Sequence, residues 1–132
     1  MAVLSGTARE LFSRPIHGWA TVTRPDGTPH NSVVWVDVDG DDVIFNTATG
    51  RAKERFIAAS PVVSLSVLDP ENDHRWASVT GPASVSEHDG DEVIDRLAKK
   101  YLGADSYPYR NATEQRVTVR VKVQHLTEET GR

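Results

Sequence analysis

The sequence predicts a mainly β fold, a six-stranded β-barrel with α-helices at its ends. Short segments rich in β-branched and aromatic residues recur along the chain, and turn-forming residues separate them. Helical spacing of apolar residues appears in only three segments. The chain has 132 residues, the length of one domain. Six or so short strands are therefore expected to close on themselves in a single domain over residues 1–132.

The first half of the chain is predicted to form a helix and a meander of three strands. Apolar residues at helical spacing predict a helix over residues 7–14, which Pro15 ends. Turn-forming Pro, Asp and Gly at residues 24–29 and 39–41 are typical of tight turns. The segments that these turns connect predict strands over residues 16–23, 30–38 and 43–47.

The second half is predicted to alternate helices and strands. Helices are expected over residues 50–60 and 90–102, the second capped by Asp89 at its start and Gly103 at its end. Strands are expected over residues 62–68, over 76–86 with a kink at Gly81 and Pro82, and over 117–123, where valine alternates with polar residues. The residues after this last strand are expected to form a polar tail.

Charge and composition exclude several classes of protein. The formal net charge is −4, which gives no general attraction to nucleic acid or to an anionic membrane. The chain has no cysteine, so a disulfide framework, a thiolate zinc site and a cysteine nucleophile are excluded. The five histidines lack metal-ligand spacing, and no metal site is expected. No signal peptide or membrane span is visible, and the expected location is the cytoplasm.

The segment from Asn46 to Arg55 is the most informative part of the chain. A strand ends in small hydroxyl residues, turns at Gly50 and leads into a helix that begins with Arg51 and Lys53. Helix N-termini normally attract acidic side chains, so two cations beside free backbone N–H groups indicate an anion site. The alternative is a solvated basic face on a surface helix. Spacing alone leaves the two interpretations equal.

The predicted second strand is another candidate. Residues 29–35 combine polar and apolar side chains in an extended segment, whose backbone groups could pair with the edge of a flat heterocycle. An ordinary barrel strand with Trp35 in the core is the alternative, and the residues alone favour it. Trp19 is expected in the core, and Trp76 in the core, at an interface or against a cofactor.

In order along the chain, these segments resemble the pyridoxamine 5′-phosphate oxidase-like split-barrel superfamily. The resemblance is nearest to its actinobacterial F-420-dependent branch and covers almost the whole chain. It depends on motifs at residues 24–30, 33–36, 46–55 and 61–72, and on Tyr101-Leu102-Gly103, Tyr107-Pro108 and the residues from Glu114 to Val117.

The resemblance implies a homodimer with two cofactors in grooves between the subunits. The strand along the cofactor ring would be formed by Asn31, Ser32, Val33 and Val34, and the site would also be lined by Thr47, Ala48 and Thr49. The phosphate would be held by the two cations Arg51 and Lys53. The partner subunit would contribute His74 and Trp76.

The function that the resemblance implies is hydride transfer from reduced coenzyme F-420, a deazaflavin, to an unsaturated small-molecule substrate. No catalytic side chain is named, because the hydride chemistry belongs to the cofactor and the protein supplies binding and orientation. Two alternatives remain open. One is an FMN-dependent oxidoreductase on the same fold. The other is a carrier that holds a flavin, deazaflavin or haem without turnover.

Overall fold

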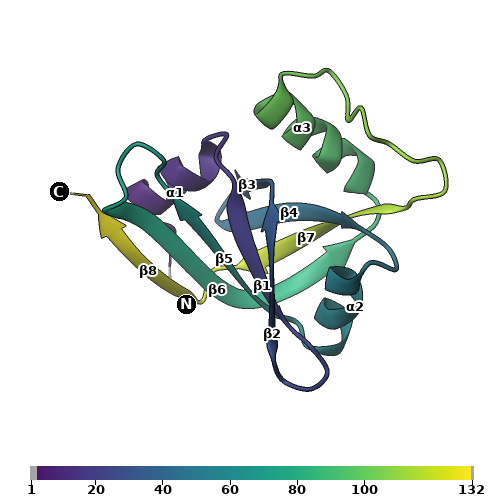
Figure 1. Cartoon of the computed structure of the whole chain (residues 1–132), viewed down its shortest axis with the longest axis horizontal. Coiled ribbons are helices and arrows are strands. Elements are labelled where there is room, and N and C mark those ends of the chain that lie inside the picture. Colours follow the sequence, from purple (N-terminus) through teal and green to yellow (C-terminus); the bar gives the residue numbers. More distant parts are fainter. Residues whose placement is uncertain (1–2, 132) are drawn as a thin grey trace.

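The computed structural model describes residues 3–131, which form eight strands and three helices (Figure 1). In chain order these are α1 (Gly6–Ser13), β1 (Gly18–Thr23), β2 (Pro29–Val34), β3 (Val36–Asp39), β4 (Asp42–Ala48), α2 (Ala52–Ala59), β5 (Val62–Leu68), β6 (Arg75–Ser86), α3 (Gly90–Leu102), β7 (Arg116–Lys122) and β8 (His125–Thr130). The structure confirms the mainly β split-barrel fold.

All strand pairs are antiparallel, and the long strand β6 belongs to both halves of the barrel. Neighbouring strands follow the order β2-β1-β5-β6-β7-β4-β3, and β8 pairs with the free side of β6. The partner of β6 changes from β5 to β7 between Pro82 and Ala83, at the position of the predicted kink. A Cβ on Gly81 would lie 1.7 Å from the Lys122 carbonyl oxygen, so only glycine fits at this crossing.

Two differences raise the number of strands from the expected six to eight. The segment predicted as one strand over residues 30–38 is divided at Trp35 into β2 and β3. The expected polar tail is wrong, because residues 125–130 form β8 along the first half of β6. Leu126 is the only large apolar residue in β8, so the segment has no strand-like hydrophobic alternation. Its conformation depends on the edge of β6 that it covers.

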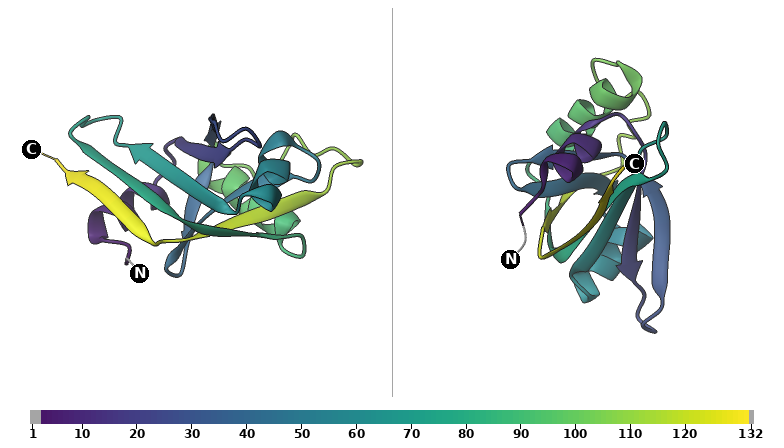
Figure 2. Two further views of the ribbon diagram at one scale, coloured as in Figure 1. Left: turned by 90° about the horizontal axis from the view of Figure 1, so that it is seen from below. Right: turned by 90° about the vertical axis from the view of Figure 1, so that its left-hand side faces the viewer.

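The buried core lies inside the barrel and continues under α1. Leu11 and Phe12 of α1 are fully buried there, with strand residues such as Phe45 and Leu65. Helices α1 and α2 lie toward opposite ends of the molecule (Figures 1 and 2). Among the described residues, no helix has the length and apolar character needed to cross a membrane.

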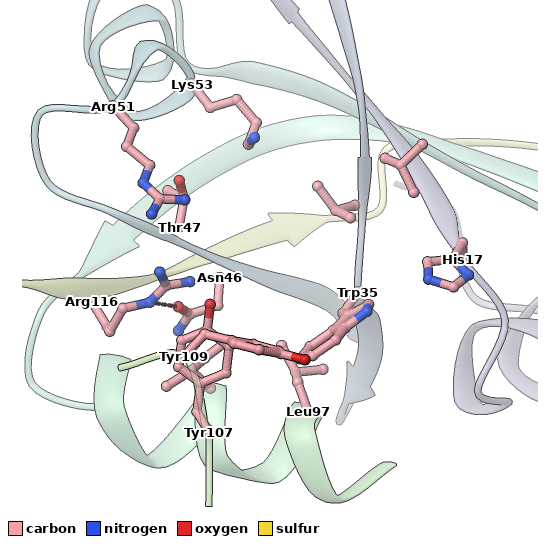
Figure 3. A pocket seen from close by; sticks show the side chains of 13 residues that line it. His17, Trp35, Asn46, Thr47, Arg51, Lys53, Leu97, Tyr107, Tyr109 and Arg116 are labelled. Atoms are coloured by element: carbon pink, nitrogen blue, oxygen red, sulfur yellow. Dashed lines mark hydrogen bonds between the residues drawn. The ribbon is translucent and has the colours of Figure 1, made fainter. Parts of the chain in front are cut away.

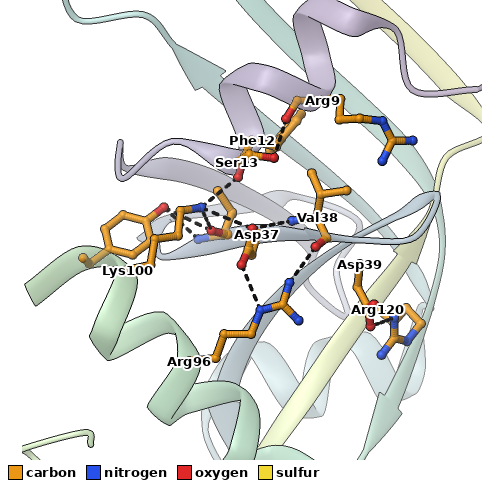
Figure 4. Close-up of polar contacts among 11 residues, drawn as sticks. Arg9, Phe12, Ser13, Asp37, Val38, Asp39, Arg96, Lys100 and Arg120 are labelled. Carbon is orange, nitrogen blue, oxygen red and sulfur yellow. Dashed lines mark hydrogen bonds and ion pairs between the residues drawn. The ribbon is translucent and has the colours of Figure 1, made fainter. Parts of the chain in front are cut away.

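Helix α3 lies outside the barrel, against β4 and β7. Its apolar side, with Val93, Ile94 and Leu97, packs on Ile44 and forms a second, smaller core. Its C-terminal half is tied to the barrel by buried polar contacts (Figure 4). Lys100 Nζ donates to the carbonyl oxygens of Phe12 (2.9 Å) and Val36 (2.5 Å). These contacts connect α3 to the break between β2 and β3.

Three local expectations need correction. Trp19 is 54% exposed rather than buried, because its neighbours Gly18 and Ala20 face the core and alternation turns Trp19 outward. Asp89 precedes α3 but makes no capping bond, since its carboxylate accepts from the Ser86 hydroxyl instead. Helix α2 begins at Ala52, so Arg51 is its N-cap residue with an extended backbone. The left-handed cap at Gly103 is confirmed, with a φ of 70°.

Candidate functional site

A pocket of about 240 Å³ lies where β2, β4, β7, α3 and the start of α2 meet (Figure 3). One side of the pocket is polar and strongly cationic, and the other is apolar and aromatic. The polar side consists of Asn46, Thr47, Arg51, Lys53 and Arg116, and the remaining lining comes from His17, Val33, Val34, Trp35, Ile94, Leu97, Tyr107 and Tyr109.

Strand register brings the cations together from two distant parts of the chain. Ala48, at the end of β4, pairs with Arg116, at the start of β7. Just beyond this pair, the Thr49 N–H donates to the Gln115 carbonyl oxygen at 2.9 Å. The chain then turns at Gly50, whose φ of 87° suits glycine, and enters α2. Arg51 and Lys53 consequently reach the same pocket as Arg116 (Figure 3).

Arg116 is a site residue that sequence reasoning missed. The residue is only 4% exposed. Its Nε donates to Asn46 Oδ1 at 2.8 Å, and its guanidinium lies 5.2 Å from the centre of the Tyr107 ring. The signal in the sequence was a basic residue immediately before a run of alternating valines, but such a residue is usually a solvated flank. Only the pairing with β4 reveals its role.

Glu114 links two of the cations. Its Oε2 accepts from Arg51 Nη2 at 2.6 Å, and its Oε1 accepts from Arg116 Nη1 at 2.7 Å. The hydrogen bond from Arg116, followed by that from Arg51, holds the pKa of this carboxyl below its usual value although burial opposes the shift. Glu114 is therefore the carboxylate counterion of a cluster that contains three cations.

Lys53 has no ion-pair partner among residues 3–131. Partial burial lowers the pKa of its ammonium group, and the positive charges of Arg51 and Arg116 lower it further. An anion in the pocket would relieve this repulsion, because it would lie against all three cations at once.

Thr47 adds an uncompensated polar group to the same side. The residue is 1% exposed, and its Oγ1 has no hydrogen-bond partner in the described part of the chain. A buried hydroxyl without a partner costs free energy, which a ligand oxygen or nitrogen would recover. His30 Nδ1 and Ser32 Oγ on β2 are also buried without partners among residues 3–131, but neither residue lines the pocket. The Thr47 hydroxyl and the cations together favour a ligand with an anionic, oxygen-rich end.

The opposite side of the pocket is built by aromatic rings. Trp35 stacks on Tyr101 of α3, and the Tyr107 ring meets Trp35 edge-on with centroids 6.2 Å apart. The loop that carries Tyr107 and Tyr109 is fastened to α3, since the Tyr107 N–H donates to Asp95 Oδ1 at 2.8 Å. This wall offers flat apolar surfaces beside the cationic cluster.

Five of the predicted site residues line this pocket, namely Val33, Val34, Thr47, Arg51 and Lys53. The others lie outside it within one chain. Asn31 accepts a hydrogen bond from the Thr21 hydroxyl on the outer side of the sheet, Ala48 is buried, and the Thr49 backbone bonds to Gln115. Ser32 lies on β2, His74 on the loop before β6, and Trp76 at the start of β6. The cofactor-binding roles of all eleven residues stay predictions.

The fold and the pocket define a small split-barrel protein with a cationic pocket beside an aromatic wall. A family model described as pyridoxamine 5′-phosphate oxidase matches residues 4–129. The chain belongs to this family. No curated protein matched the chain in sequence.

Solved structures agree with this assignment. An F-420 reductase is 31% identical, with a TM-score of 0.81 over 90% of this chain and 94% of that one. A conserved hypothetical protein from Mycobacterium tuberculosis, Rv2991, is 22% identical, with a TM-score of 0.72 over 98% and 85% of the two chains. An FMN-binding protein from Nostoc punctiforme is 13% identical, with a TM-score of 0.62 over 85% and 72%. The last two similarities concern the fold alone.

Proposed function

We propose that this protein binds coenzyme F-420 and transfers hydride from the reduced cofactor to an unsaturated small-molecule substrate. The observation that carries the proposal is the cluster of Arg51, Lys53 and Arg116 around the orphaned hydroxyl of Thr47. A phosphate would satisfy the hydroxyl and neutralise the mutual repulsion of the cations. FMN, whose phosphate also follows a ribityl chain from the ring, is the second candidate.

The residues present fit the phosphate end of such a cofactor. Arginine recognises phosphate through paired N–H donors, and lysine adds a point charge. The pocket volume of about 240 Å³ is below the range of roughly 300–1,000 Å³ that small-molecule sites usually have. The pocket would therefore hold one end of the cofactor and leave the ring to extend along β2, where Val33 is both part of the pocket wall and 49% exposed.

When bound, the cofactor supplies the hydride chemistry, and the chain supplies binding and orientation. Arg51, Lys53 and Arg116 anchor the phosphate and thereby fix the position of the ring. Val33 and Val34, which both line the pocket, would lie beside the ring region, and Trp35 would limit the access of water from the side of α3. The similarity to an F-420 reductase, at 31% identity, favours F-420 over FMN.

A second copy of the chain would complete the ring site in this proposal. The outer face of the sheet carries Trp19, Val33, Leu68 and Trp76, which strand register places on one side. Trp19, Val33 and Leu68 are each about half exposed. Because Val33 belongs both to this face and to the pocket, a homodimer formed through the face would bring partner residues to the cofactor. His74 and Trp76 are the residues we propose for that contact.

The decisive experiment is a titration of the cofactor-free protein with F-420 and with FMN. Tighter binding of F-420, followed by reduction of an enone when reduced F-420 is supplied, supports the proposal. Tighter binding of FMN supports the second candidate, and cofactor binding without turnover indicates a carrier. Failure to bind either cofactor contradicts the whole assignment. Trp76→Ala should weaken cofactor binding without loss of folding, whereas unchanged affinity would mean that Trp76 only packs.

A further inference from the structure

We propose that Glu114 is a positioning residue that makes the site selective for the phosphorylated form of its cofactor. The inference depends on the proposed function, because it assumes that a phosphate occupies the cationic side of the pocket. Glu114 itself would not touch the phosphate. It would act through Arg51 and Arg116, the two arginines that its carboxylate joins.

The carboxylate uses one oxygen for each arginine. Oε2 lies 2.6 Å from Arg51 Nη2, and Oε1 lies 2.7 Å from Arg116 Nη1. When no phosphate is bound, the two neighbouring guanidinium groups repel each other. The Glu114 carboxylate between them offsets this repulsion and allows them to stay close together. The bridge also leaves each arginine with further N–H groups that Glu114 does not use, because a guanidinium has five N–H donors.

The position of Glu114 places it behind the arginines. Arg51 and Arg116 line the pocket, whereas Glu114 does not, and its side chain is only 16% exposed. Glu114 therefore lies behind the arginines and outside the space that an anion would occupy.

The two arginines need Glu114 to different degrees. The Arg116 side chain is 5% exposed and is also held by Asn46 and by the Tyr107 ring. The Arg51 side chain is 52% exposed, and Glu114 provides its only side-chain hydrogen bond in the described part of the chain. Without Glu114, Arg51 would sample many rotamers, and binding a phosphate would have to order it. Immobilising such a side chain lowers affinity by about two- to tenfold.

The test compares phosphorylated and phosphate-free forms of the same ring. Glu114→Gln keeps the shape of the side chain and one acceptor oxygen but loses the charge. We expect the variant to bind F-420, or FMN, about three- to tenfold more weakly than the unmodified protein. We expect it to bind the matching phosphate-free deazaflavin, or riboflavin, with unchanged affinity. Glu87→Gln, which removes an exposed carboxylate outside the pocket, is the matched control and should leave both affinities unchanged.

A double substitution tests whether Glu114 acts through Arg51. In the Arg51→Ala background, Glu114→Gln should weaken phosphate-dependent binding by much less than it does alone. Unchanged or tighter binding of the phosphorylated cofactor by Glu114→Gln would overturn the inference, as would an equal loss for both forms. If the unmodified protein binds phosphorylated and phosphate-free forms equally, the phosphate site of the proposed function fails and the inference fails with it.

Discussion

The rings of Trp35 and Tyr101 are stacked, with centroids 5.2 Å apart and planes inclined by 10°. Trp35 is the single residue between β2 and β3, and Tyr101 lies in the last turn of α3. The Tyr101 hydroxyl accepts from the Val36 N–H at 3.0 Å and donates to the Ile16 carbonyl oxygen at 2.6 Å. Tyr101 therefore fixes both the break between the strands and the aromatic wall of the pocket.

Tyr101→Phe is expected to destabilise the protein by about 1–3 kcal/mol, because it leaves the Val36 N–H without its hydroxyl partner. The ring stack on Trp35 should persist. Urea denaturation measures the change in the free energy of unfolding. Tyr107→Phe is the matched control, since the Tyr107 backbone N–H, but not its hydroxyl, makes a hydrogen bond within residues 3–131, and little change is expected. Equal stability of the two variants would show that the Tyr101 hydroxyl is dispensable.

Lys100 predicts a pH dependence of stability. Burial lowers the pKa of its ammonium group to about 8, although Asp37 opposes the shift. In the unfolded chain the pKa is about 10.4. Between these values the unfolded chain binds more protons than the folded protein, so raising the pH stabilises the fold. Burial raises the pKa of Tyr101 to about 12, so this neighbour stays protonated in the same window.

The measurement is the difference in unfolding free energy between the unmodified protein and Lys100→Met at several pH values. The unfolding free energy of the unmodified protein should increase relative to that of Lys100→Met as the pH rises from about 8 toward 10. A difference that stays constant over this range would mean that Lys100 keeps an ordinary pKa in the folded protein.

Arg51→Ala and Lys53→Ala should each weaken binding of F-420 or FMN by roughly ten- to a hundredfold, the loss of one charge-assisted hydrogen bond. Neither variant should unfold, because Arg51 is half exposed and Lys53 has no ion-pair partner in residues 3–131. Isothermal titration calorimetry measures the affinities, with exposed Lys99→Ala as the control for the loss of a positive charge. Normal affinity in both variants would restore the interpretation of a solvated basic helix face.

Trp19→Glu should prevent dimer formation. It places a charge at the centre of the outer sheet face, opposite Val33 in the strand pair. Light scattering should show a dimer for the unmodified protein and a monomer for the variant. Leu102→Glu, which alters an equally exposed apolar residue at the end of α3, should remain dimeric. A stable monomer of the unmodified protein with full cofactor affinity would contradict the proposed homodimer.

The sequence by itself determined the elements whose signals are local. Apolar periodicity located the three helices of the described residues, turn residues separated most of the strands, and the Gly103 cap follows from backbone geometry. Arg51 and Lys53 could be found because they are neighbours in the chain, beside a turn that only glycine adopts readily. In each of these cases the physical cause lies within a few residues.

Tertiary structure decided what depends on partners far along the chain. Arg116 and Glu114 join the site because the β4–β7 register sets Ala48 opposite Arg116. Trp35 becomes a pocket wall because Tyr101, 66 positions later, stacks on it. Residues 125–130 become a strand because β6 offers them an edge, and Trp19 faces outward because sheet pairing fixes which side of β1 meets the core. Burial and charge environment are properties of the assembled fold, so local residue patterns do not specify them.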